Sequence, residues 1–251
     1  MYGILQTKKI PKDVPAIKMP AWLATLGKLR TPKQLRREMQ ASVSATVSFN
    51  TVLTYNLHYE ISGFGCQSAA VPREDGNGYK FCRRFEWDVG FEPAFSFAPL
   101  HGAEEPVRIR YTPGFVGALS GHVPGDWAIA MNFSPGYDAG GSNVSAMPAA
   151  WIIREMLASG YCYEDVRDWL LDKKCIKQAY IILVSQYSAC WIVLDPSRSM
   201  MLKEVHFPEV LCVGNEVEQD EYDPTDWIGI GDKPYHADEG EWILDQYQHI
   251  V

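Results

Sequence analysis

The chain has 251 residues, of which 47% are hydrophobic, and its formal net charge at pH 7 is −8. This length fits one compact domain preceded by an extension, and no apolar run reaches the roughly 18 residues that a membrane-spanning helix needs. The first residues lack the basic and then apolar pattern of a signal peptide, so we expect a cytoplasmic protein.

The six cysteines are spread along the chain without a C-x-x-C pair, and the six histidines form no cluster. This distribution gives no indication of a zinc site or of a disulfide framework. We therefore expect reduced cysteines, several of them buried as small apolar side chains. We expect no metal and no other cofactor.

The charge differs strongly between the two ends of the chain. Residues 1–40 carry a net charge of +7, whereas residues 216–251 carry −10. Such ends either attract each other within the fold or leave the basic end available for a weak contact with anionic lipid. A solvated surface explains the same charges equally well. Nothing here resembles a nucleic-acid-binding motif, so we expect no nucleic-acid partner.

The N-terminal part predicts an irregular opening and then a helix. Residues 1–20 are rich in proline and lysine, and Pro32 suits the first position of a helix. Apolar residues at roughly helical spacing predict a helix from Lys33 to about Tyr59. Glycines follow up to Gly65, and they indicate a tight turn immediately before Cys66.

From Cys66 onward the sequence is typical of strands interrupted by one pair of helices. A strand from Cys66 to Val71 and one from Tyr79 to Val89 flank Asp75-Gly76-Asn77-Gly78, which is a hairpin turn sequence. Further strands are predicted at residues 108–111, 114–119, 127–133, 179–185, 190–194, 201–205 and 210–213, and helices at 148–158 and 164–174. This order predicts a layered α+β sandwich with helices outside two antiparallel sheets.

Four short motifs contain the candidate catalytic residues. They are Gly65-Cys66-Gln67-Ser68, Cys82-Arg83-Arg84-Phe85-Glu86-Trp87, Met131-Asn132-Phe133-Ser134-Pro135-Gly136 and Gly214-Asn215. A cysteine after a glycine is, by itself, more often a buried structural residue. The series as a whole, however, resembles the N-terminal nucleophile (Ntn) hydrolases of the choloylglycine hydrolase and acid ceramidase branch. That group includes bile salt hydrolases, penicillin V acylase and N-acylethanolamine acid amidase.

The resemblance implies a four-layer αββα sandwich and a chain that cuts itself between Gly65 and Cys66. Residues 1–65 would then be a largely helical pro-segment or α-chain, and residues 66–251 the catalytic domain with an acidic C-terminal tail. The segment from Asn56 to Ile61 is similar to the end of the pro-segment in acid ceramidase and N-acylethanolamine acid amidase. The resemblance therefore implies an amidase that hydrolyses linear amide C–N bonds of lipid-like N-acyl amides.

The residue types suit this chemistry. A terminal cysteine supplies both a thiol and an α-amine, whose ordinary pKa values of about 8.5 and about 7.7–8.0 allow proton exchange near neutrality. By the resemblance, Arg83 lies beside the Cys66 thiol and Glu86 orients the α-amine. Asn132 and Asn215 are the expected donors to the oxyanion. Asn132 could equally be a turn residue beside Ser134-Pro135-Gly136.

Three features depart from the family pattern. Glu86 replaces an aspartate, Gln67 replaces the usual threonine, and no arginine follows Asn215. Arg84 and Asp88 also offer an alternative register for the arginine and the carboxylate. Two other functions therefore stay open: an acyltransferase of the same fold, and an uncleaved pseudoenzyme that binds a lipid or a protein.

Overall fold

The computed structural model describes residues 31–57, 65–86, 96–99, 107–111, 114–134, 143 and 145–214. Its helices are α2 (Lys33–Ala41), α3 (Phe49–Asn56), α4 (Ala149–Leu157) and α5 (Tyr163–Leu171). Its strands are β1 (Gly65–Pro72), β2 (Tyr79–Glu86), β3 (Ser96–Pro99), β4 (Arg108–Tyr111), β5 (Ser120–Val123), β6 (Trp127–Phe133), β7 (Ala179–Ser185), β8 (Ser188–Leu194), β9 (Met200–His206) and β10 (Leu211–Val213). Among the described residues, each helix is too short or too polar to span a bilayer.

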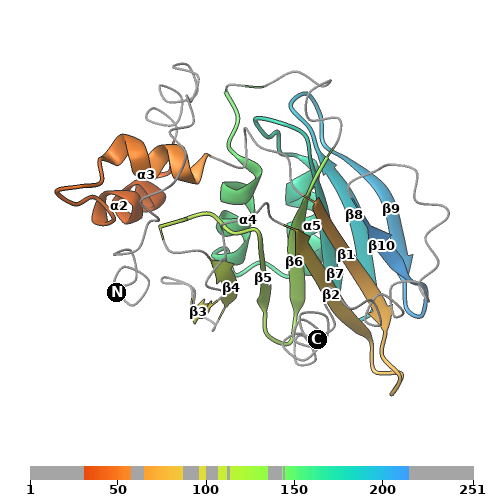
Figure 1. Ribbon diagram of the computed structural model, residues 1–251. Helices are drawn as coiled ribbons and strands as arrows, with labels where there is room; N and C mark the ends of the chain where they lie inside the picture. The colour runs from red at the N-terminus through yellow and green to blue at the C-terminus, as the bar shows by residue number, and fades with distance from the viewer. Residues whose placement is uncertain are drawn as a thin grey trace.

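The strands form two antiparallel sheets. A three-stranded sheet has the order β10-β1-β2, and a seven-stranded sheet runs in sequence order from β3 to β9. The β1–β2 hairpin lies in front of β6 and β7 of the large sheet (Figure 1). Helices α4 and α5 cover the opposite face of the large sheet.

Side chains of the central strands point alternately to the two faces of the large sheet and so belong to two separate cores. On β6, Ile129 and Met131 belong to the core shared with α4 and α5, whereas Ala128 and Ala130 belong to the core between the sheets. Strand β7 repeats the pattern, because its successive side chains point to opposite faces. Both faces of the large sheet are thus buried at its centre, which accounts for the nearly continuous apolar sequence of β7 and β8.

The prediction of an α+β fold with two antiparallel sheets is confirmed, as is the β1–β2 hairpin. Its turn is closed by a bond from the Arg73 N–H to the Gly78 carbonyl, and Asp75 accepts from the Asn77 N–H. The described residues contain three of the four expected layers: the helices α4 and α5, the large sheet and the small sheet. Among the described residues, no helix lies over the outer face of the small sheet.

The single helix predicted from Lys33 to Tyr59 is wrong. The chain forms α2 and α3, separated by residues 42–48. Serine side chains explain the break, because they bond to nearby backbone groups in place of the helical pattern. Ser44 accepts from the N–H groups of two following residues, and Ser48 caps α3 by accepting from the Thr51 N–H at 3.1 Å. Residues 58 and 59 lie outside the described residues.

The strand predicted at residues 114–119 is also wrong. This segment is irregular, and Gly114 has a φ of 84°, which is incompatible with a strand. The strand β5 begins only at Ser120. The structure also adds β3, which the sequence pattern did not predict.

Candidate active site

Cys66 is the second residue of β1, and its side chain is buried with 3% exposure. Its Sγ lies 3.8 Å from Nη2 of Arg83 on the neighbouring strand β2. Because β1 packs against β6, this pair lies between the two sheets. A guanidinium close to a thiol favours the ionised thiolate, which is the nucleophilic form.

Arg83 is a buried cation with 1% exposure. Its Nη1 donates to the Leu119 carbonyl, and its Nη2 donates to the Met131 carbonyl at 2.6 Å. A buried charge needs such partners, because water no longer solvates it. The two carbonyls come from the approach to β5 and from β6, so the large sheet fixes the guanidinium at the thiol.

Asn132 lies inside β6 and is fully buried. Its Oδ1 accepts from the Ser68 hydroxyl at 2.8 Å, and its Nδ2 donates to the Val213 carbonyl at 2.6 Å. The interpretation of Asn132 as a turn residue is therefore wrong. Its amide instead links β6 to β10 and to Ser68 of β1, which is two residues from Cys66 along the strand.

The β1–β2 register distinguishes between the two arginines. Arg83 pairs with Ser68 and Phe85 pairs with Cys66, whereas Arg84 pairs with Gln67. Because side chains alternate along a strand, Arg83 shares the face of Cys66 and Ser68. Glu86, the last residue of β2, pairs with Gly65 along the backbone. This geometry favours Arg83 over Arg84 as the arginine beside Cys66, and the choice between Glu86 and Asp88 stays a prediction.

Three of the residues considered from the sequence lie wholly or partly outside the described structure. The structure describes the backbone of Glu86 but not its side chain, and Asp88 and Asn215 lie outside the described residues. The residue before Asn215, Gly214, is buried directly after β10. The structure therefore brings together Cys66, Arg83 and Asn132 from the predicted set.

None of the six cysteines forms a disulfide, and several have surroundings unlike that of Cys66. Burial, together with the nearby Cys212, raises the pKa of Cys82 to about 11, against a weaker opposing effect of Lys80. Burial also raises the pKa of Cys190 to about 12. The Cys175 thiol donates to the Lys177 carbonyl. These three cysteines behave as packing residues.

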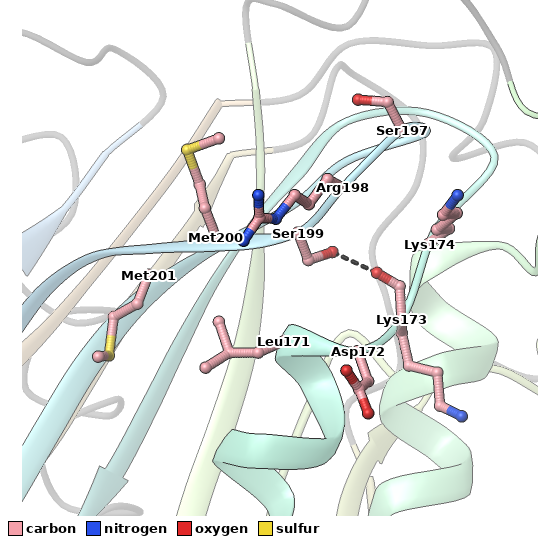
Figure 2. Close-up of a pocket in the computed structure, with 9 residues that line it drawn as sticks. All are labelled: Leu171, Asp172, Lys173, Lys174, Ser197, Arg198, Ser199, Met200 and Met201. Carbon is pink, nitrogen blue, oxygen red and sulfur yellow. Dashed lines mark hydrogen bonds between the residues drawn. The ribbon is translucent and has the colours of Figure 1, made fainter.

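A surface pocket of about 530 Å³ lies away from these residues, between the end of α5 and the start of β9 (Figure 2). Its lining combines apolar and charged side chains: Leu171, Asp172, Lys173, Lys174, Ser197, Arg198, Ser199, Met200 and Met201. None of the predicted site residues lines it. Within the described part of the chain, no group of three or more His, Cys, Asp or Glu residues is arranged to hold a metal ion.

Sequence reasoning missed some of the groups that build this site. Ser68 was part of the first motif, but only the structure pairs it with Asn132. The carbonyls of Leu119 and Met131 carry no sequence signal, because every residue has a backbone carbonyl.

No family model and no curated protein sequence matches the chain. Among solved structures, the chain is similar to the Caenorhabditis elegans N-acylethanolamine-hydrolyzing acid amidase ortholog. The TM-score is 0.50 and the sequence identity 13%, and the match covers 71% of this chain and 85% of that chain. The similarity confirms the fold expected from the four motifs, which is that of the Ntn hydrolases.

Proposed function

We propose that the protein is a cysteine amidase that activates itself by cleavage between Gly65 and Cys66. The observation that carries this proposal is the buried Cys66 thiol at the start of β1, 3.8 Å from the Arg83 guanidinium. The similarity in fold to an N-acylethanolamine-hydrolyzing acid amidase supports N-acyl amides as the substrate class. The proposed substrate combines an apolar acyl chain with a small or poorly charged amine.

In the proposed cleavage, the Cys66 thiol attacks the carbonyl of Gly65. The acyl group moves from nitrogen to sulfur, and water then hydrolyses the thioester. The products are a carboxylate at Gly65 and a free α-amine and thiol at Cys66. Gly65 assists because a residue without Cβ lets the sulfur approach its carbonyl closely.

In the proposed amidase reaction, the new α-amine accepts the thiol proton, and the sulfur attacks the substrate carbonyl. Backbone or side-chain donors of Asn132 and Asn215 stabilise the developing oxyanion. The leaving amine takes a proton from the ammonium group, and a thioester forms at Cys66. Water activated by the α-amine then releases the carboxylic acid and restores the thiol.

Arg83 has two roles in this proposal. Its positive charge stabilises the thiolate before attack, and its bonds to Leu119 and Met131 hold that charge in place. A charge fixed before the reaction stabilises developing negative charge without reorganisation. The fork of the guanidinium, which bonds two carbonyls at once, is a geometry that lysine does not reproduce.

The test combines intact mass with hydrolysis of a panel of N-acyl amides of increasing acyl length. We expect purified wild type to give two fragments, residues 1–65 and 66–251, and activity that rises with chain length. Cys66→Ala should give one uncut and inactive chain, whereas Cys82→Ala should still be cut.

Four outcomes would contradict parts of the proposal. Amide hydrolysis by the Cys66→Ala variant would remove Cys66 from the mechanism. An uncut and inert wild type would favour the pseudoenzyme, and acyl transfer to added amines in preference to water would favour the acyltransferase. Equal activity at all acyl lengths would contradict the lipid-like substrate.

A further inference from the structure

Asn56, the last residue of α3, uses its whole side-chain amide in buried hydrogen bonds. The side chain is 1% exposed. Its Oδ1 accepts from the Val116 N–H at 2.6 Å, and its Nδ2 donates to the Gly114 carbonyl at 2.8 Å. Nδ2 also donates to the Val52 carbonyl at 2.9 Å within the helix. The amide thereby pairs with residues 114–116 as a neighbouring strand would.

Residues 114–119 lead from this contact to the Cys66 site. The Phe115 ring packs edge-on against Tyr55 of α3, with 6.4 Å between the ring centroids. A Cβ at Gly117 would lie 2.9 Å from the Phe115 ring and 3.0 Å from the Ala150 Cβ, so this segment is tightly enclosed. It ends at Leu119, whose carbonyl accepts from both the Met131 N–H and Arg83.

A chain of direct contacts therefore joins α3 to the candidate nucleophile. Asn56 holds residues 114–116, the same segment presents the Leu119 carbonyl to Arg83, and Arg83 lies at Cys66. Asn56 belongs to the part of the chain before Cys66, whereas the other groups belong to the part after it. The segment ahead of the proposed cut thus supports the site from outside.

We propose that Asn56 is a positioning residue that acts through segment 114–119 to keep the Arg83 guanidinium beside Cys66. The proposal rests on the proposed function, in which residues 1–65 become a separate piece. It extends that function, because the released piece stays a required part of the mature site.

The test is the pH midpoint at which Cys66 is alkylated by iodoacetamide, resolved from the other thiols by peptide mass spectrometry. Arg83 from β2 is a charged group in contact with the thiol, and β6 contributes the neutral Asn132 nearby. Asn56→Ala should displace Arg83 and raise the midpoint by about 1 pH unit, the lower end of the effect of a nearby opposite charge. All variants are compared in the same cleavage state, established by intact mass.

Two control variants separate positioning from general stability. Val52→Ala removes buried packing on the same helix, so it should lower the melting temperature without moving the midpoint. Asn50→Ala changes an exposed asparagine of α3 and should alter neither quantity. An equal midpoint shift in Val52→Ala would overturn the proposal.

A double-mutant cycle with Arg83→Ala tests whether Asn56 affects Cys66 through Arg83. If Asn56 acts through Arg83, then Asn56→Ala should cause no further shift once Arg83 is absent. A full additional shift in that background would overturn the proposal. Asn56→Ser, which keeps a small polar side chain, should raise the midpoint as well. If neither Asn56 variant folds, the residue has a structural role and the positioning role is refuted.

Alkylation needs neither turnover nor cleavage, so the two proposals fail separately. A wild type that neither cuts itself nor hydrolyses amides contradicts the proposed function. The midpoints in the Asn56 variants and in the double mutant still decide whether Asn56 positions Arg83.

Discussion

At the scale of single residues, Cys66 is as buried as Cys82, Cys175 and Cys190, and its described feature is the Arg83 guanidinium 3.8 Å from its Sγ. Its neighbour Arg83 is a fully buried cation that donates to the backbone carbonyls of Leu119 and Met131. These bonds hold its charge next to a thiol, where a nucleophile would need it.

Replacing Arg83 should therefore be far more damaging than replacing Arg84. We expect Arg83→Ala to lower kcat/KM for amide hydrolysis by about 10²-fold or more, because a fixed charge in the transition state is lost. Arg84→Ala, the matched change one residue along β2, should have a small effect. Steady-state kinetics on both variants, with circular dichroism to check folding, measure the difference. A sensitive Arg84 and a tolerant Arg83 would show that the other register is the functional one.

At the scale of elements, local side-chain bonds set where α3 begins. The Ser48 hydroxyl accepts from the Thr51 N–H, and it also lies 2.9 Å from the Thr51 hydroxyl. A helix begins with unpaired N–H groups, and a capping side chain satisfies one of them. The position of α3 in turn fixes Asn56 at its other end.

Removal of this cap should destabilise the protein modestly. We expect Ser48→Ala to lower the free energy of unfolding by about 1 kcal/mol, whereas Ser48→Asp, another good cap, should leave it nearly unchanged. Urea denaturation followed by circular dichroism provides the measurement. Equal losses in both variants would show that the hydroxyl does not act as a cap in solution.

At the scale of the whole molecule, the segment before Cys66 is joined to the rest by a core of its own. Side chains of α2 and α3 form one buried cluster with residues from the later part of the chain: Leu35, Met39, Val52, Leu53, Leu57, Val116, Trp151 and Ile176. A largely buried ion pair between Glu38 and Arg154 closes at 3.2 Å beside it. The attachment of this segment therefore does not depend on the peptide bond at Gly65.

After cleavage, the two pieces should stay together under native conditions. We expect residues 1–65 and 66–251 to co-elute in size-exclusion chromatography and to separate only in denaturant, because apolar burial of this kind is not released by cutting the chain. Separation of the pieces in native buffer would contradict both this expectation and the positioning role of Asn56.

The buried thiols also predict how stability depends on pH. The pKa of Cys82 rises from 9.0 to about 11 in the folded protein, and that of Cys190 from 9.0 to about 12. Between pH 9 and these values the folded state holds protons that the unfolded state has lost, so stability is intact below pH 9 and falls above it. Each such thiol lowers the free energy of unfolding by about 1.4 kcal/mol per pH unit in this window.

Alkaline denaturation of paired variants checks this pH dependence. Cys190→Ala should be less stable than wild type at pH 7, because a buried side chain is lost, yet its stability should fall less steeply above pH 9. The exposed Cys162, whose pKa is also raised but which is not buried, provides the comparison, and its replacement by alanine should change the slope less than Cys190→Ala does. Identical slopes in all three proteins would show that Cys190 ionises normally in the fold.

The local pattern of the sequence determined much of the secondary structure and the fold class. The turn from Asp75 to Gly78, the strands β6 and β7 and the helices α4 and α5 all follow from turn residues and from apolar spacing. The family resemblance carried by the four motifs also implied the Ntn hydrolase fold, which the structural similarity confirms. The turns, strands and helices depend on residues that are close together in the chain, so they can be predicted from the sequence.

Only the tertiary structure decided what holds the site together. Arg83 is fixed by the carbonyls of Leu119 and Met131, and Asn56 reaches Gly114 across 58 positions of the chain. Periodicity reports which face of an element is buried, but it does not report which distant backbone group a buried polar side chain will meet. Every residue offers a carbonyl, and packing between elements selects the one that is used.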